Sequence, residues 1–319
     1  MPYDLSKTLV IGISSRSLFD LEEENRIFEE RGLEAYRDYQ IEHEDNPPPK
    51  GTAFHLVEGL LRLNQSGRQR DPKSPPLVEV VIMSRNSAEI GLRLFNATKH
   101  YGLDITRGAF TSGTPLSDYL DAFSINLFLS KYHRDVSAAL EAGVAAAIIQ
   151  EPPDGFEPDQ ETIRIAFDGD AVIFSNESER IYQEQGIEAF LAHERENARR
   201  ELPEGPFAKL LRALSHLQQT FPAESSPLRM ALVTARHGPA IERVIRTLRD
   251  WRVNIHESFF LGGVSKDEVL KAFRAHIFFD DQRAHIGPAS RVVPSGHVEN
   301  ERDAEAATHV PDTAPDVAD

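Results

Sequence analysis

The sequence predicts an α/β protein made of two tandem, doubly wound parallel-sheet domains that arose by internal duplication, with a small helical cap inserted in the second. Three observations lead to this prediction. The chain has 319 residues, which is about two domains at roughly 150 residues each. Its second half repeats the pattern of its first half. Short apolar stretches alternate with amphipathic ones, which is typical of parallel strands connected by helices.

The repeat is clearest in the first part of each half. With an offset of 154 residues, residues 26–63 lie over residues 180–217 without a gap, and Gly32 matches Gly186. Farther along, the offset becomes 150 and the match is weaker. Self-similarity at a nearly fixed offset is the signature of repeated structural units. We therefore expect two copies of one domain.

Apolar spacing places the elements of the second copy. Residues 163–167 are expected to form a strand, and helical spacing of charged and leucine residues predicts helices over 177–200 and 206–220. These two helices are interpreted as the cap, at about 177–220. The remaining elements are expected to be strands at 230–233, 257–261 and 276–279, and helices at 239–251 and after Gly262-Gly263. After Pro288 the apolar pattern fades.

Polar residues follow these strands. The first strand runs into Asp168-Gly169-Asp170, the second ends at Thr234, and the fourth is followed by Asp280-Asp281. The helix that the Gly262-Gly263 turn opens bears Lys266. Ligands of parallel sheets bind outside the carboxyl ends of the strands, so these residues are expected to form one site. Paired carboxylates cannot be buried and charged unless a cation offsets them, and Mg²⁺ is the natural partner of such oxygen ligands.

Five passages, in this order, resemble the cytosolic 5′-nucleotidase type I family of the haloacid-dehalogenase-like superfamily. They are ISSRSLF at 13–19, YQIEHE at 39–44, AFDGDAV at 166–172, LVTAR at 232–236 and HIFFDDQ at 276–282. The resemblance covers roughly residues 8–286. It implies Rossmann-type domains and hydrolysis of nucleoside 5′-monophosphates, namely AMP or its deoxy and pyrimidine relatives.

The resemblance also implies roles for the site residues. Asp168 would be the nucleophile that forms an aspartyl-phosphate, and Asp170 would protonate the leaving oxygen and then activate water. The phosphoryl oxygens would be bound by Thr234, Ala235, Lys266 and Gly169, with Lys271 as an alternative to Lys266. Mg²⁺ would be held by Asp168, the main-chain carbonyl of Asp170, and the pair Asp280 and Asp281, of which Asp281 is preferred. Thr234 is also a candidate N-cap of the next helix.

The first copy lacks these groups. Ser14-Ser15-Arg16 stands at the Asp-Gly-Asp position, and the other replacements are Ser84, Leu116 and Ser130-Lys131. We therefore expect a degenerate, non-catalytic repeat at 1–153, a catalytic domain at 160–298 and a disordered acidic tail at 299–319. Basic and polar residues still mark the strand ends. The candidates for contacting the substrate or a regulatory nucleotide are Arg16, Arg85, Asn86, Thr111 and, in the second copy, Arg236.

Composition limits the remaining possibilities. Lys and Arg number 35 against 51 Asp and Glu, a net charge of −16, which disfavours nucleic acids and anionic membranes as partners. Cysteine is absent, which excludes disulfides and thiol catalysis. The first residues do not resemble a secretory leader, and the apolar run at 142–149 is far below the roughly 20 residues of a membrane span. A cytoplasmic protein is expected, and family habit suggests a homo-oligomer.

The sequence thus favours a Mg²⁺-dependent 5′-nucleotidase with a small-molecule nucleotide as its substrate. Two alternatives stay open. One is a phosphatase for another small phosphomonoester such as a sugar phosphate. The other is a nucleotide sensor that binds without hydrolysis. The motifs themselves indicate phosphomonoester hydrolysis, whereas the nucleotide is implied only by the resemblance.

Overall fold

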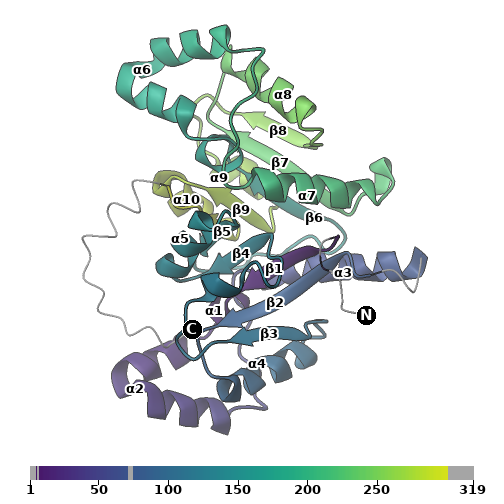
Figure 1. Ribbon diagram of the computed structural model, residues 1–319, viewed down its shortest axis with the longest axis vertical. Helices are drawn as coiled ribbons and strands as arrows, with labels where there is room; N and C mark the ends of the chain where they lie inside the picture. The colour runs from purple at the N-terminus through teal and green to yellow at the C-terminus, as the bar shows by residue number, and fades with distance from the viewer. Residues whose placement is uncertain (1–4, 6, 71–74, 301–319) are drawn as a thin grey trace. The chain divides into compact units, whose positions relative to one another are not determined.

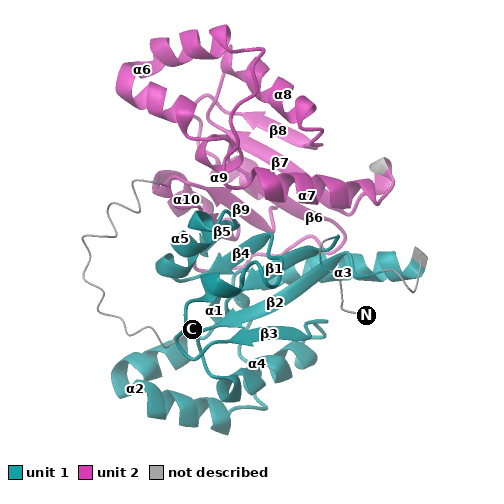
Figure 2. Ribbon diagram, viewed as in Figure 1, with its two compact units in different colours: residues 1–149, 301–319 teal, residues 150–300 magenta. Residues whose placement is uncertain are grey.

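The computed structural model describes residues 5, 7–70 and 75–300 (Figure 1). The described chain divides into two compact units, of which unit 1 extends to Ile149 and unit 2 is Gln150–Asn300 (Figure 2). Parallel strands and intervening helices make up each unit, so the predicted α/β class is confirmed. The predicted tail lies, from residue 301 onward, outside the described residues.

Strands of unit 1 pair in parallel in the order β3-β2-β1-β4-β5. They are β1 (Leu9–Ile13), β2 (Val78–Ser84), β3 (Arg107–Phe110), β4 (Leu127–Ser130) and β5 (Ala145–Ile149). The helices are α1 (Ser15–Leu18), α2 (Glu22–Glu42), α3 (Phe54–Arg70), α4 (Ala88–His100), the 3-10 turn η1 (Leu116–Tyr119) and α5 (His133–Glu141).

Strands of unit 2 pair in parallel in the order β10-β9-β6-β7-β8. They are β6 (Ile163–Phe167), β7 (Leu228–Thr234), β8 (Glu257–Phe260), β9 (Ile277–Asp280) and β10 (Ser295–His297). The helical elements are η2 (Gly169–Ile173), α6 (Glu177–Glu196), α7 (Ala208–Gln219), η3 (Ala223–Ser225), α8 (Ala240–Asp250), α9 (Asp267–Phe273) and α10 (Arg283–Ala289).

The two units follow the same plan, strand for strand. In each, the first strand lies between the second and fourth, and the third strand pairs with the second. Helices α2 and α6 share a kink at the matched glycines, Gly32 with φ 80° and ψ −177° and Gly186 with φ 81° and ψ −179°. Only glycine adopts this backbone conformation readily. The repeat read from the sequence therefore corresponds to matched elements.

Burial explains why these segments are strands. All seven residues of β2 are buried, and β7 is buried except for Arg229. Parallel strands are covered on both faces and read as continuous apolar runs. In unit 2 the apolar face of α7, with Leu210, Leu214 and Leu217, is buried. The Gln218 side chain donates to the carbonyl of Leu228 at the start of β7, so α7 covers the sheet.

The sequence predicted four strands in the repeated domain, whereas each unit has a fifth, β5 in unit 1 and β10 in unit 2. The strand β10 is buried although it consists of Ser295, Gly296 and His297. Three residues without an apolar side chain give no periodic signal. The fading of the apolar pattern after Pro288 therefore hid a segment that pairs with β9.

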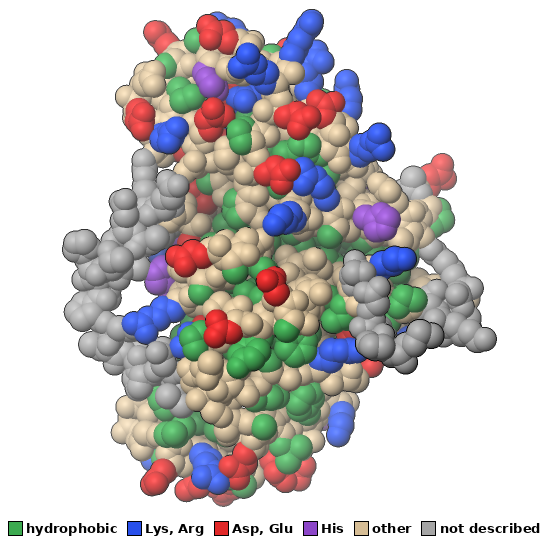
Figure 3. Space-filling model, viewed as in Figure 1, with side chains coloured by type: hydrophobic (Ala, Val, Ile, Leu, Met, Phe, Trp, Pro, Cys, Tyr) green, Lys and Arg blue, Asp and Glu red, His purple; other side chains and the backbone are tan. Residues whose placement is uncertain are grey.

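Surface charge is mixed on the face shown in Figure 3. Basic and acidic side chains are interspersed there, without a continuous basic area among the coloured residues. Within the part of the chain that the structure describes, no helix is both long enough and apolar enough to cross a membrane.

Candidate active site

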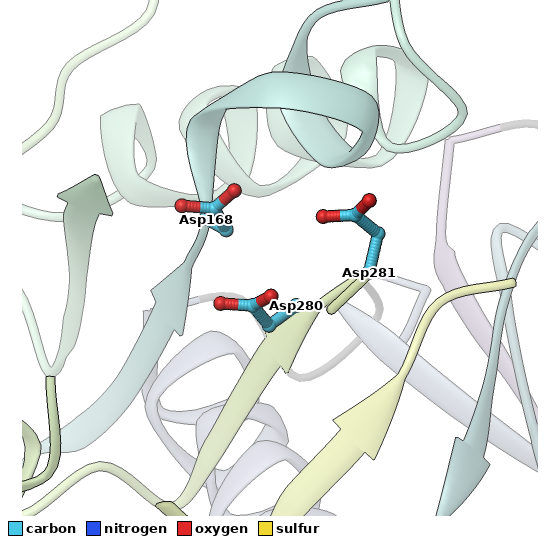
Figure 4. Close-up of side chains that lie close together, drawn as sticks. All are labelled: Asp168, Asp280 and Asp281. Atoms are coloured by element: carbon cyan, nitrogen blue, oxygen red, sulfur yellow. The ribbon is translucent and has the colours of Figure 1, made fainter. Parts of the chain in front are cut away.

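Three aspartates meet at the carboxyl ends of β6 and β9. The register aligns Phe167 with Phe279, and the amide of Asp168 donates to the Phe279 carbonyl at 2.8 Å. The residues that follow these strands are therefore neighbours. One carboxylate oxygen from each of Asp168, Asp280 and Asp281 lies within 4.8 Å of the others (Figure 4). The sequence predicted this convergence.

Lys266 joins two of the three acids. Its Nζ donates to Oδ1 of Asp168 and to Oδ2 of Asp280, both at 2.6 Å. The side chain is buried, and Lys266 is the residue just before α9. Lys271, the alternative considered from the sequence, lies on the exposed side of α9. Of the two lysines, the structure thus brings Lys266 into the site.

Burial and neighbouring charges shift the pKa values of all three aspartates. Burial raises the pKa of Asp168 to about 7, with Lys266 opposing this effect and Asp280 adding to it. Burial and the charges of Asp168 and Asp280 raise the pKa of Asp281 to about 8. Burial also acts to raise the pKa of Asp280, but Lys266 and His285 favour its charged form and hold that pKa below its usual value. Three acids thus gather around one lysine that bonds only two of them, and the site has a deficit of positive charge.

The donor set fits a hard divalent cation. Within the described residues, Oδ1 of Asp281 is buried and has no hydrogen-bond partner, while its Oδ2 accepts from Asn300 at 3.2 Å. Both oxygens of Asp280 are engaged, Oδ1 by the amide of Gln282 at 2.8 Å and Oδ2 by Lys266. An orphaned buried carboxylate oxygen beside other acids is costly unless a cation approaches. The Asp168, Asp280 and Asp281 group can therefore hold a metal ion.

Thr234 borders the aspartates at the end of β7. Its side chain is buried, and its Oγ1 accepts from the Arg236 amide at 3.2 Å. A Cβ built on Gly169 would lie 3.3 Å from this hydroxyl, so the loop after Asp168 runs directly past Thr234. Ala235 follows it and is exposed. Helix α8 begins only at Ala240, after Pro239, so the additional role of Thr234 as its N-cap, predicted from the sequence, is wrong.

Asp170 pairs with Arg236. The guanidinium donates from Nε to Oδ2 at 2.8 Å and from Nη2 to Oδ1 at 2.6 Å. Its Nη1 donates to Glu194 on α6 at 2.6 Å. The sequence singled out Asp170 and Arg236 separately, but gave no sign that they pair. It missed Glu194 altogether, because one glutamate in a charged helix has no distinguishing pattern.

The C-terminal segment of unit 2 also contacts the site, which the sequence did not predict. Besides the Asn300 contact, His297 of β10 bonds the main-chain carbonyl of Asp281 through Nε2 at 2.9 Å. Both residues lie beyond the point at which the apolar pattern fades. They fix the loop that carries Asp281, and no local signal in the sequence marks them.

The remaining candidate residues lie in unit 1 and bond within it. Arg16 donates to Glu22 at 2.8 Å, and to Asn25 and Tyr132 at 3.0 Å. The other contacts are Arg85 with Asp135, Asn86 with the Tyr36 hydroxyl, and the Thr111 hydroxyl with the Thr114 carbonyl. At the positions matching Asp168, Thr234 and Asp280 stand the buried residues Ser14, Ser84 and Ser130.

Comparison with known proteins identifies the family. A family model described as 5′-nucleotidase matches residues 1–305. The chain belongs to the 5′-nucleotidase family. It is 36% identical over 289 residues to human cytosolic 5′-nucleotidase 1B, a match that covers 89% of this chain and 47% of the human protein. The chain thus spans about half the length of this relative. The predicted resemblance of the chain to the 5′-nucleotidase family is confirmed.

Proposed function

We propose that this chain is a Mg²⁺-dependent 5′-nucleotidase that hydrolyses nucleoside 5′-monophosphates to nucleoside and phosphate through an aspartyl-phosphate. The carrying observation is the buried Asp168 carboxylate, bonded to Lys266 and within 4.8 Å of an Asp281 oxygen. Phosphoryl transfer through a covalent intermediate needs such a nucleophile beside fixed positive charge. Family membership supports the nucleotide, with AMP or its deoxy and pyrimidine relatives as the proposed substrates.

Asp168 is the proposed nucleophile. Its Oδ1 accepts from Lys266, so we assign the in-line attack to Oδ2. A bond forms between this oxygen and phosphorus while the bond from phosphorus to O5′ breaks, and Asp170 gives a proton to O5′. In the second step Asp170 takes a proton from water. The water oxygen attacks phosphorus, the bond to Asp168 breaks, and inorganic phosphate leaves.

Asp168 and Asp281 are the proposed side-chain ligands of Mg²⁺, together with the main-chain carbonyl of Asp170. When bound, Mg²⁺ supplies the positive charge that keeps Asp168 ionised and offsets the charge of the phosphoryl oxygens. Asp280 is the less available ligand because both its oxygens are engaged. We therefore assign Asp280 to holding Lys266 in place. Its engagement supports the preference for Asp281 derived from the sequence.

Four groups around Asp168 are proposed to bind the phosphoryl oxygens of the substrate. These are the Thr234 hydroxyl, the Lys266 ammonium, and the main-chain amides of Gly169 and Ala235. Gly169 and Thr234 adjoin each other, and Lys266 is already bonded to the nucleophile. Preorganised donors of this kind are typically worth about 10²–10³ in rate each.

We propose that the two units descend from one duplicated haloacid-dehalogenase-like domain and that unit 1 is not catalytic. Serines at the matched positions supply no carboxylate that could form an aspartyl-phosphate or offset the charge of a metal ion. Arg16, Arg85, Asn86 and Thr111 are proposed to contact the nucleotide or a regulatory nucleotide. Arg16→Ala is expected to raise KM or to weaken the response to an effector nucleotide. Unchanged values of both would count against this role.

Asp168→Asn tests the proposed reaction. We expect the wild-type chain to release phosphate from AMP with Mg²⁺ and to lose this activity in EDTA, and we expect Asp168→Asn to lose turnover with Mg²⁺ present. Asp250→Asn, which changes an exposed carboxylate of the same unit, is the matched control and should keep full activity. Turnover by Asp168→Asn at the wild-type rate would exclude the proposed nucleophile.

The alternatives are separated by two further measurements. A panel of nucleoside 5′-monophosphates and sugar phosphates should show higher kcat/KM for the nucleotides, and equal values would favour a general phosphomonoesterase. A nucleotide sensor would bind AMP without releasing phosphate and would keep that response in Asp168→Asn. The human relative is named cytosolic, and we propose the same location for this chain. Homo-oligomerisation stays a prediction.

A further inference from the structure

Arg236 is clamped between two acids of different elements. Its side chain is only 2% exposed, and each of its three nitrogens donates to a carboxylate oxygen. Two of these bonds go to the two oxygens of Asp170, and the third goes to Glu194. This is the side-on geometry in which a guanidinium fixes both the position and the plane of a carboxyl group.

Glu194 is itself fixed, although it lies on a kinked helix. Its side chain is fully buried, and Oε1 accepts from the Ser178 hydroxyl at 2.8 Å and from Arg243 of α8 at 3.0 Å. Oε2 accepts from Arg236 at 2.6 Å. The Arg243 guanidinium also bonds the main-chain carbonyl of Arg200 at 3.1 Å. Glu194 therefore connects α6 and α8 to the arginine that grips Asp170.

The backbone around Asp170 is irregular. This residue lies in the irregular turn η2 with non-helical φ and ψ, and the next residue, Ala171, has φ 59°. Alanine rarely adopts this left-handed conformation. In this turn, Arg236 bonds both oxygens of the Asp170 carboxyl group and thereby holds it in one orientation.

Comparison with unit 1 shows which of the two arginines, Arg236 or Arg243, is found only where the turn carries a carboxylate. The helix-anchoring arginine is kept there, because Arg93 matches Arg243 and donates to Glu24 at 2.6 Å and to Gln40 at 2.8 Å. The pair formed by Asp170 and Arg236 has no counterpart in unit 1. Arg16 stands at the position of Asp170, and Asn86 stands at the position of Arg236. The arginine that grips the turn is thus found in the unit whose turn carries a carboxylate.

We propose that Arg236 is a positioning residue for Asp170, anchored by Glu194, and that it orients the Asp170 carboxyl group for proton transfer to the leaving O5′. This inference rests on the proposed function. Each carboxylate oxygen has two lone pairs, so the side-on pair leaves one on each oxygen to carry or accept a proton. The proton on Asp170 moves to O5′ as the bond from phosphorus to O5′ breaks. Arg236 itself exchanges no proton and does not bind the nucleotide.

Leaving-group dependence tests this role. In the 5′-thio analogue of the nucleotide, sulfur replaces the bridging oxygen, and a thiolate leaves without protonation because thiols have a pKa near 8.5. General acid catalysis typically contributes about 10²–10⁴. We expect Asp170→Asn to lower kcat/KM by about that factor for the oxygen nucleotide and by less than about threefold for the thio analogue, which sets the reference pattern.

Arg236→Met should lower kcat/KM by at least about tenfold for the oxygen nucleotide and by less than about threefold for the thio analogue. Arg236→Lys keeps the positive charge but cannot bond both carboxylate oxygens side-on. Its kcat/KM for the oxygen nucleotide should lie between those of the wild type and Arg236→Met. Arg243→Met removes another donor to Glu194 without touching Asp170, and is expected to change kcat/KM for both substrates by the same factor. Glu194→Gln should give a weaker form of the Arg236→Met pattern.

Equal losses for the two substrates in Arg236→Met would overturn the proposal, as would a rise in KM alone, which would mark Arg236 as a nucleotide-binding residue. If Arg236→Met does not fold, Arg236→Lys and Glu194→Gln decide the question by the same ratio. A wild-type chain that hydrolyses neither substrate would refute the proposed function instead. The two failures are therefore distinguishable.

Discussion

Asp281→Asn should make the metal-free protein more stable while abolishing its response to Mg²⁺. The substitution keeps the shape of the side chain and removes a buried carboxylate whose Oδ1 has no hydrogen-bond partner among the described residues. An asparagine oxygen can still accept from Asn300, which now donates to Oδ2 at 3.2 Å. The substitution therefore removes charge without opening a cavity.

The pKa of Asp281 sets the size of this effect. The carboxyl has a pKa of about 8 in the folded chain against an ordinary value of 3.8. Because the folded pKa is raised, its stabilising contribution is complete below pH 3.8 and is lost as the pH rises towards 8. At about 1.4 kcal/mol per pH unit, the cost to the metal-free fold at pH 7 is about 4 kcal/mol. For a unit of this size, that corresponds to roughly 10 °C in Tm.

Thermal unfolding of the full chain in EDTA, at pH 5, 7 and 8.5, measures the effect. The gain in Tm of Asp281→Asn over the wild type should be small at pH 5 and should grow with pH. Addition of Mg²⁺ should raise the Tm of the wild type and leave that of the variant unchanged. Asp250→Asn is the control without effect. A variant that is no more stable than the wild type in EDTA at pH 8.5, or that Mg²⁺ stabilises equally, would refute the reasoning.

Two further predictions concern Lys266 and Gly205. Lys266→Met should lower kcat/KM by at least about 10² and, by leaving buried acids uncompensated, should destabilise the metal-free chain by about 3 kcal/mol. Lys271→Met, on the exposed side of α9, should do neither, and equal effects in phosphate-release and denaturation assays would contradict this assignment. Gly205→Ala should cost about 3 kcal/mol in urea denaturation, because its Cβ would lie 2.3 Å from the Phe174 carbonyl oxygen. Gly287→Ala, with nothing within 4 Å of the new Cβ, should cost no stability, and similar losses in both variants would show that this close approach is unimportant.

Family membership and the acidic cluster were accessible from the sequence for a simple physical reason. Asp168 directly follows a buried apolar strand, and Thr234 and Asp280 end two others. The carboxyl ends of parallel strands meet at one edge of a sheet. Strand order along the chain therefore sufficed to predict that these residues converge. The repeat added which half could be catalytic, since serines replace the carboxylates in the other copy.

Tertiary structure alone decided how the site is held. Arg236 pairs with both Asp170 and Glu194, and its contact with Glu194 depends on the direction in which α6 runs after its kink at Gly186. The contact of Asn300 with Asp281 depends on β10, a strand without an apolar side chain. Local periodicity reports burial of a face, whereas these contacts join side chains from distant elements whose mutual orientation is set by packing. The sequence by itself thus determined which chemical groups gather, and the packed chain determined which of them hold the others in place.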